Sequence, residues 1–318
     1  MPESRLEIVE IGPVARRALA PGAAGEVRAV FERSFYAVLD GQWICFGPRA
    51  LGAGPLNALY APGSAEGWRG LLAAGEPAHV MGHEIRIGEF GFGFGSAADW
   101  NPAGSATADR QALAAGLRAL DAVLAGLMPQ DGLAVLMRPA IRRESLPALA
   151  RAAEGAVRRL GDLVRAVPAT GTIPDFAPLS PLLGLGPGLT PSGDDVIGGA
   201  LVALRRLGRA DLADAIRTWL ETVTDRTNDV SLAHLRAAAE GCGAAALHEI
   251  LDDLLHGRAA DLPSAVAAIG SIGHTSGWDA LAGAVVVLRA WLEAPSSGAG
   301  GLRPRFRPAC KPHPRGLA

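Results

Sequence analysis

Two segments of the chain, 192–205 and 276–289, repeat almost the same sequence 84 residues apart. Eight of their fourteen positions are identical, and each begins with Ser-Gly, has Asp at its fourth position and continues as an apolar run. This pattern is typical of a polar helix N-terminus that leads into a buried helix. A glycine-rich stretch precedes each copy, at 184–191 and 270–275, and lets backbone N–H groups approach a small molecule. We expect the two helix starts to face one shared site.

Composition limits the classes of protein that this chain can belong to. Its 318 residues are 49% hydrophobic, which is enough for one large domain or two ordinary ones. The three cysteines, Cys45, Cys242 and Cys310, form no Cys-x-x-Cys pair, so neither a disulfide framework nor a zinc site is indicated. A net charge of −2 gives no general attraction to nucleic acid. The N-terminus does not resemble a signal peptide and no apolar stretch approaches a membrane span, so we expect a soluble cytoplasmic protein.

The first half has the pattern of an antiparallel sheet. Segments 28–39 and 42–46 flank Asp40-Gly41, a dipeptide that favours a two-residue hairpin turn. Further strands are expected at 56–60, 78–81, 84–87 and 133–137, and the glycine-rich run 91–95 is expected to be a bent strand that buries alternate aromatics. Apolar residues at helical spacing predict helices at 107–127 and 145–167.

The second half is helical in pattern. Helices are expected at 193–207, 211–223, 230–240, 244–256, 262–269 and 277–292. Sheet followed by helices predicts an α+β architecture. We expect an α+β N-terminal domain at 1–170, a helical domain at 171–294 that carries the glycine-rich motifs, and a boundary within 168–181. Residues 295–318 are rich in Pro, Gly, Ser and Arg, which predicts a disordered basic tail.

The first motif places acidic and hydroxyl groups at a helix start. Ser192 can cap the helix, Asp195 follows three residues later as in a capping box, and Asp194 lies near the positive end of the helix dipole. Capping does not explain Gly198 and Gly199, which cost about 1 kcal/mol each relative to alanine in a helix. The glycines indicate close approach of either another helix or a ligand.

The second motif adds a histidine. His274 lies in a glycine-rich, hydroxyl-rich turn and is the candidate for proton transfer, although a capping or packing role fits equally well. We assign His274, Asp195 and Asp194 as candidate catalytic residues. The candidate substrate-binding residues come from the two motifs and from a glycine- and proline-rich turn in the first half: Gly186, Gly188, Thr190, Ser192, Gly193, Thr275, Ser276, Gly277, Asp279 and Arg49.

A magnesium site is a further candidate. Asp194 and Asp195 offer oxygen ligands for Mg²⁺, but neighbouring helix positions diverge by about 100°, so a partner such as Asp279 would have to join them. The polar segment 224–231 is expected to be a solvated loop, with Arg226 and Asn228 as secondary candidates.

Segments 183–195 and 273–283 together resemble a bacterial family, long of unknown function, that includes the AllH-type subunit of oxamate carbamoyltransferase from anaerobic allantoin breakdown. The resemblance extends over most of 25–292 and is strong in the C-terminal half. It implies a reaction in which phosphate takes the carbamoyl group of oxalurate, giving oxamate and carbamoyl phosphate, or the reverse. It also implies partner subunits, and a pocket for small anions at the two helix N-termini.

Two other functions remain open at this point. One is a metal-dependent amidohydrolase of a small ureido compound. The other is a non-catalytic assembly subunit, in which the repeated glycines only allow two helices to cross closely.

Overall fold

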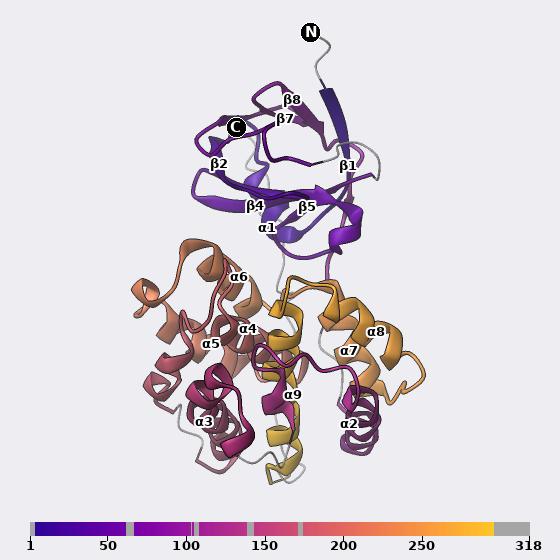
Figure 1. The fold of residues 1–318 in the computed structure, drawn as a ribbon, viewed down its shortest axis with the longest axis vertical. Coiled ribbons are helices and arrows are strands. Elements are labelled where there is room, and N and C mark those ends of the chain that lie inside the picture. The colour runs from indigo at the N-terminus through magenta and orange to yellow at the C-terminus, as the bar shows by residue number, and fades with distance from the viewer. Residues whose placement is uncertain are drawn as a thin grey trace, which may run out of the picture. The chain divides into compact units, whose positions relative to one another are not determined.

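The computed structural model describes residues 4–61, 67–102, 104, 108–138, 143–170 and 174–295. Two compact units are present, residues 1–102 and 103–318 (Figure 1). Strands make up the first unit and helices the second, so the predicted α+β class is confirmed. The predicted boundary at 168–181 lies inside the second unit, because the helices at 110–124 and 148–170 both pack on its last helix. The predicted tail lies almost entirely outside the described residues.

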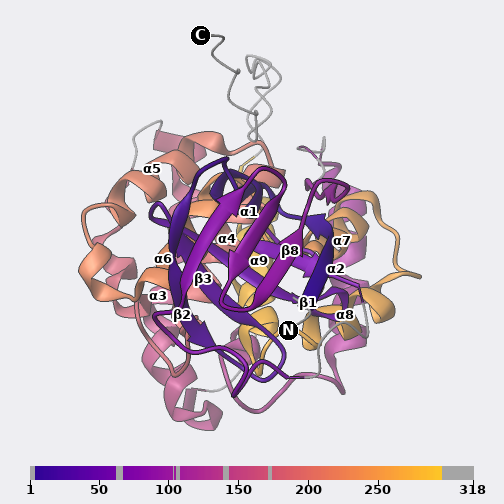
Figure 2. The same cartoon turned by 90° about the horizontal axis from the view of Figure 1, so that it is seen from above.

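A sheet that closes on itself forms the first unit. Its described strands are β1 (Ser4–Ile11), β2 (Ala24–Val30), β3 (Phe35–Leu39), β4 (Gln42–Pro48), β5 (Asn57–Tyr60), β6 (Pro77–Met81), β7 (Glu84–Ile87), β8 (Phe90–Gly93) and β9 (Ala98–Asp99), with the helix α1 (Pro13–Ala18) and the short 3₁₀ helix η1 (Arg49–Leu51). The order is β5-β4-β3-β2-β6-β7-β8-β1-β9, and an antiparallel pairing of β1 with β5 closes the ring. Figure 2 shows this unit from above, with β1, β2, β3 and β8 labelled. Closure leaves few unpaired strand edges.

Aromatic side chains fill the interior of this sheet. The Phe35 ring stacks on Phe46 at 4.9 Å between centroids and meets the Trp68 ring edge-on at the same distance. Trp68 is fully buried, and its indole N–H donates to the Tyr60 hydroxyl at 2.8 Å, so its polar atom is satisfied. Phe92 and Phe94 are both buried, as the glycine-rich run predicted.

The hairpin at Asp40-Gly41 is confirmed. Both residues have positive φ, 46° and 78°, as the two-residue turn between β3 and β4 requires. Segment 28–39, however, was wrongly predicted as one strand. The chain turns between β2 and β3, where the Phe31 N–H donates to the Ser34 carbonyl at 2.8 Å.

Helices α2 (Arg110–Leu124), α3 (Ala148–Thr170), α4 (Ser192–Arg206), α5 (Ala210–Leu220), α6 (Asp229–Ala239), α7 (Ala245–His256), α8 (Leu262–Gly270) and α9 (Ser276–Glu293) form the second unit. Short 3₁₀ helices connect them: η2 (Ala134–Met137), η3 (Arg143–Ser145), η4 (Ala177–Leu182) and η5 (Thr224–Arg226). Every helix that the sequence predicted is present. No described helix combines the length and apolar character needed to cross a membrane.

The strand predicted at 133–137 is wrong, because this segment forms η2. The Leu133 N–H just before it donates to the Asp279 carboxylate of α9 rather than to a strand, and Ala134 and Met137 are buried in the helical core.

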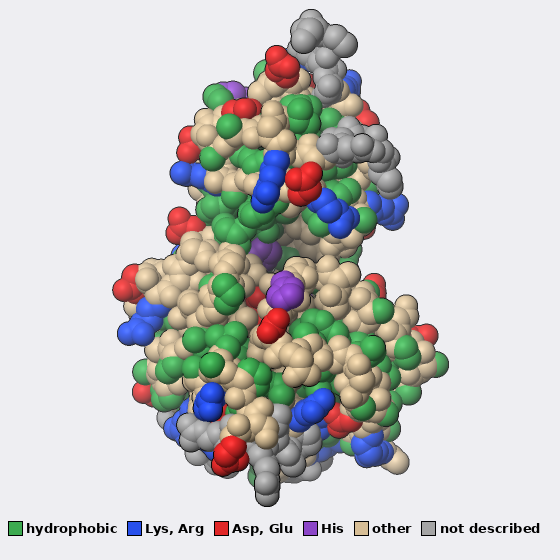
Figure 3. Space-filling model, viewed as in Figure 1, with side chains coloured by type: hydrophobic (Ala, Val, Ile, Leu, Met, Phe, Trp, Pro, Cys, Tyr) green, Lys and Arg blue, Asp and Glu red, His purple; other side chains and the backbone are tan. Residues whose placement is uncertain are grey.

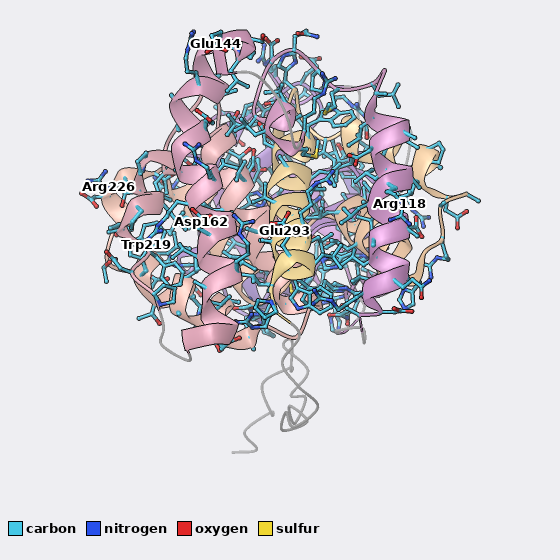
Figure 4. All side chains as sticks on the ribbon, turned by 90° about the horizontal axis from the view of Figure 1, so that it is seen from below. Arg118, Glu144, Asp162, Trp219, Arg226 and Glu293 are labelled. Atoms are coloured by element: carbon cyan, nitrogen blue, oxygen red, sulfur yellow. The ribbon has the colours of Figure 1, made fainter. Side chains whose placement is uncertain are left out.

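Helices α4 and α9 lie at the centre of the helical unit. Figure 4 shows α9, marked by Glu293, between α3 with Asp162 and α2 with Arg118. An ion pair of 2.6 Å joins Arg165 of α3 to Glu293. The side chains on nearly all faces of α4 and α9 are buried, which explains their almost uninterrupted apolar sequences.

The two central helices cross in direct backbone contact. A methyl group at Gly199 would lie 1.7 Å from the carbonyl oxygen of Ala280, and one at Gly283 would lie 1.8 Å from that of Val196. Gly198 differs, because the nearest atom to a methyl group there, the Ala238 Cβ, is 3.8 Å away. The contacts are therefore reciprocal, and they use the glycine that both motifs share.

This crossing predicts opposite effects for neighbouring glycines. Gly199→Ala and Gly283→Ala should each lower the free energy of unfolding by at least about 2 kcal/mol, since the added methyl group overlaps a carbonyl. Gly198→Ala is the matched control and should raise it by up to about 1 kcal/mol through helix propensity. Urea denaturation of the full chain measures all three. Equal effects of Gly198→Ala and Gly199→Ala would contradict the crossing.

Candidate functional site

The N-termini of α4 and α9 meet at one place. The Thr190 Oγ1, two residues before α4, lies 2.9 Å from the Oγ of Ser276, the first residue of α9. The prediction that the two repeated motifs converge is therefore confirmed.

Each helix supplies a hydroxyl to the acid of the other helix. The hydroxyls of Ser276 and Thr190 face the Asp195 carboxyl on α4, and those of Ser192 and Thr275 face the Asp279 carboxyl on α9. Neither Ser192 nor Ser276 caps its own helix, because the N-cap residues are Pro191 and Thr275. Neither helix has a side-chain hydrogen bond at its N-cap. The capping role predicted for Ser192 is thus wrong. In each motif, Ser-x-x-Asp instead supplies a hydroxyl to the acid of the other helix and an acid that receives the other helix's hydroxyl.

Several backbone N–H groups at these helix starts bond to their own loops. The Gly193 N–H donates to Leu185 at 2.9 Å, and the Gly277 N–H donates to Ile272 at 3.2 Å. A methyl group at either glycine would lie 2.0 Å from a carbonyl oxygen, of Leu182 and Ile269 respectively. In this structure Gly193 and Gly277 therefore shape the approach loops.

The other two predicted glycines have positive φ in the loop before α4. Gly186 has φ of 114° and backs onto Ser192, where a Cβ would lie 3.2 Å from the serine Oγ. Gly188 has φ of 100°, and a Cβ there would meet no described atom within 4 Å. The loop backbone is thus packed beside Ser192 and open at Gly188.

Asp194 holds three segments together. Its buried carboxylate accepts the Gly184 N–H at 2.9 Å, the Ser231 hydroxyl at 2.7 Å and the Thr227 hydroxyl. Asn228, between the last two, caps α6 by accepting the Ser231 N–H at 2.9 Å. Part of the polar segment 224–231, expected to be a solvated loop, is therefore tied to α4, and the roles of Thr227 and Ser231 were missed.

A third segment reaches the site from the loop after α2. The Leu133 N–H donates to the Asp279 Oδ1 at 2.5 Å. Gly132 has φ of 77°, and a methyl group there would lie 2.7 Å from the same oxygen. The sequence contained a signal for this contact, the Asp131-Gly132 pair, but it was interpreted as a turn before a strand.

Burial raises the pKa of all three aspartates. It is the largest influence on the pKa of Asp195, which is held well above the ordinary range although the Ser276 hydroxyl lowers it. The Asp279 charge raises the pKa of Asp195 further. Burial also raises the pKa of Asp279 and of Asp194, against the hydrogen bonds that each carboxylate accepts. The site therefore favours at least one un-ionised carboxyl.

His274 lies apart from this network. Its side chain is 84% exposed, and its Nε2 lies 3.3 Å from the Oδ2 of Asp131. Figure 3 shows histidine side chains (purple) at the surface on the face in view. Arg49 is exposed in the other unit, on η1. The secondary candidate Arg226 is also exposed, at the periphery of the helical unit (Figure 4).

The magnesium site predicted at Asp194 and Asp195 depends on carboxylate oxygens that are free to bind an ion. Among the described residues, however, no group of three or more His, Cys, Asp or Glu side chains is arranged to hold a metal ion. The Asp194 carboxylate already accepts three hydrogen bonds, so Asp195 and Asp279 are the acids with oxygens to spare.

The raised pKa values predict a pH dependence of stability. An acid whose pKa is raised on folding stabilises the protein fully below its unfolded pKa, and this contribution is lost as the pH rises through the folded pKa. Asp195→Asn should therefore make the free energy of unfolding fall less between pH 4 and pH 8, by up to about 1.4 kcal/mol per pH unit. The matched control is Asp214→Asn on the exposed face of α5. An unchanged pH slope in Asp195→Asn, measured by urea denaturation, would contradict the raised pKa.

Comparison with known proteins identifies the segment that contains this site. Residues 182–288 match the family model for "Oxamate carbamoyltransferase subunit AllH". No curated protein and no solved structure gives a significant match. The matched segment contains the first repeated motif and all but the last residue of the second, from the glycine loop before α4 to near the end of α9. The similarity to this family is thus carried by residues 182–288, the part of the chain that contains the site.

Proposed function

We propose that this chain is the subunit of a carbamoyltransferase that binds a small ureido or oxamate-type anion at the N-termini of α4 and α9. The reaction is the transfer of a carbamoyl group between oxalurate and phosphate, giving oxamate and carbamoyl phosphate, or the reverse. One observation carries the proposal: the Ser276 hydroxyl of α9 faces the Asp195 carboxyl of α4, and the Ser192 hydroxyl of α4 faces the Asp279 carboxyl of α9. All four residues lie within the matched segment. Pure helix packing requires the shared glycines but no buried acids.

The reaction needs hydrogen-bond donors for the carbonyl oxygen of the carbamoyl group and a proton for the nitrogen of the leaving oxamate. When a phosphate oxygen attacks the carbamoyl carbon of oxalurate, negative charge develops on the carbonyl oxygen, and hydroxyls such as those of Thr190 and Ser276 can stabilise it. The bond to the oxamate nitrogen then breaks, and that nitrogen takes up a proton. An un-ionised Asp195 carboxyl can supply it, and in the reverse direction the carboxylate can accept it. His274 is the alternative proton donor, and its exposure requires substrate to reach the rim of the site.

Phosphate meets repulsion at this site unless a positive charge or a proton offsets the two acids. A raised pKa at Asp195 reduces that repulsion. Mg²⁺ held by Asp195 is another way to offset it. Partner subunits, which the family description implies, can supply further cationic groups.

A non-catalytic assembly role is the second candidate. It is favoured by the direct backbone contact of α4 and α9 at Gly199 and Gly283, which needs no ligand. In that case the chain would bind its partner subunits but no small anion.

Ligand binding tests the proposal on the full chain. Carbamoyl phosphate or oxamate at 100 times its Kd should stabilise the fold by about 2.7 kcal/mol and raise the melting temperature. Asp195→Ala and Ser276→Ala should abolish this ligand-induced shift, because they remove the acid and one of its hydroxyl partners. The exposed control Asp214→Ala should leave the shift intact.

The subunit assignment has its own readout. Mixing the chain with its partner subunits should give carbamoyl phosphate from oxalurate and phosphate, and Asp195→Ala should reduce the rate at least about 100-fold if the acid transfers the proton. Full activity of the assembly with Asp195→Ala would contradict a catalytic role for this site. Absence of any ligand-induced shift together with normal assembly would favour the second candidate.

A further inference from the structure

Two carboxyl oxygens in the site have no partner. The Oδ2 atoms of Asp195 and Asp279 are both buried, and neither has a hydrogen-bond partner among the residues that the structure describes. Asp279 as a whole has no exposed surface. Leaving a buried acceptor unsatisfied costs about 1–3 kcal/mol of stability. Two such acceptors in one place are therefore unusual in a folded protein.

Several of the neighbouring protein donors are already committed. The Leu133 N–H goes to Asp279 Oδ1, and the hydroxyls of Ser192 and Thr275 face the same carboxyl. Thr190 and Ser276 hydrogen-bond to each other, so one of their two hydroxyl protons is used between them. Only one hydroxyl proton is then left for Asp195. When both acids are ionised, the site therefore has more acceptors than donors.

On the basis of the proposed function, we propose that Asp195 and Asp279 bind the N–H groups of an amide or ureido ligand, while its anionic end lies elsewhere. Amide and ureido nitrogens supply the missing donors, two on one nitrogen. A phosphate or carboxylate group in the same position would add acceptors to a site that lacks donors, and its charge would oppose that of the acids.

Exposure shows where such a ligand would enter. Thr190, Asp195 and Ser276 are partly exposed, whereas Ser192 and Asp279 are buried. The amide therefore meets Asp195 first and replaces the hydrogen bond between Thr190 and Ser276. Asp279 acts as the deeper acceptor, held in place by the Leu133 N–H.

Three ligands of matched shape test this assignment. Oxamate carries one amide and one carboxylate, oxamide has two amides, and oxalate has two carboxylates. Isothermal titration of the full chain should show binding of oxamate and oxamide, and binding of oxalate at least about tenfold weaker, because oxalate has no N–H to donate.

A matched variant reverses the donor pattern. Asp195→Asn keeps the shape and replaces one acceptor oxygen by an N–H₂ donor, so it should weaken oxamide at least about tenfold and strengthen oxalate relative to it. Asp279→Asn should act in the same direction, and Thr190→Val, which keeps both acids, should retain the preference for amides. Circular dichroism establishes that each variant is folded.

The outcomes separate this inference from the function on which it rests. Binding of oxalate and carbamoyl phosphate but not oxamide, with sensitivity to Asp195→Asn, would keep the proposed function and overturn the inference. Binding that requires Mg²⁺ and is equally strong for ligands with and without an amide would overturn the inference as well. Binding of oxamide without carbamoyl phosphate would support the inference and contradict the proposed reaction, and no binding of any ligand would contradict both.

Discussion

The direct contact of α4 with α9 is the constraint on which the site depends. The two helices touch backbone to backbone because Gly199 and Gly283 have no side chains, and each faces a carbonyl of the other helix. This contact fixes the helix starts, so that Ser192 reaches Asp279 and Ser276 reaches Asp195. A larger residue at either glycine would push the helices apart and separate each acid from its hydroxyl. The repeat in the sequence is thus a repeat of one packing device.

Burying acids beside one another works against stability, and the surrounding structure compensates only partly. Asp194 is well supplied, with one backbone and two side-chain donors, and it ties the glycine loop and α6 to α4. Asp195 and Asp279 each keep a buried oxygen without a partner. Unsatisfied acids of this kind are typical of binding and catalytic sites, where a ligand completes the hydrogen bonds. Asp194 therefore has a structural role, whereas our proposal directs Asp195 and Asp279 at a ligand.

Local patterns predicted much of this molecule, and long-range contacts explain the rest. The Asp40-Gly41 turn and the helices were predictable because their signals lie within a few residues. The repeated motif also predicted that Ser192 and Ser276 converge. The exchange of hydroxyls between helices was not predictable, since Ser-x-x-Asp fits a capping box equally well. Segment 133–137 was mistaken for a strand because its partner, Asp279, lies 146 residues away.

A crystal structure of the full chain with oxamate bound would test the central claim most directly. The account predicts the oxamate amide nitrogen within hydrogen-bond distance of Asp195 Oδ2, the Thr190–Ser276 bond opened, and the Gly199 and Gly283 contacts unchanged. Oxamate bound at another place, with both carboxyl oxygens still buried and unpartnered, would contradict it.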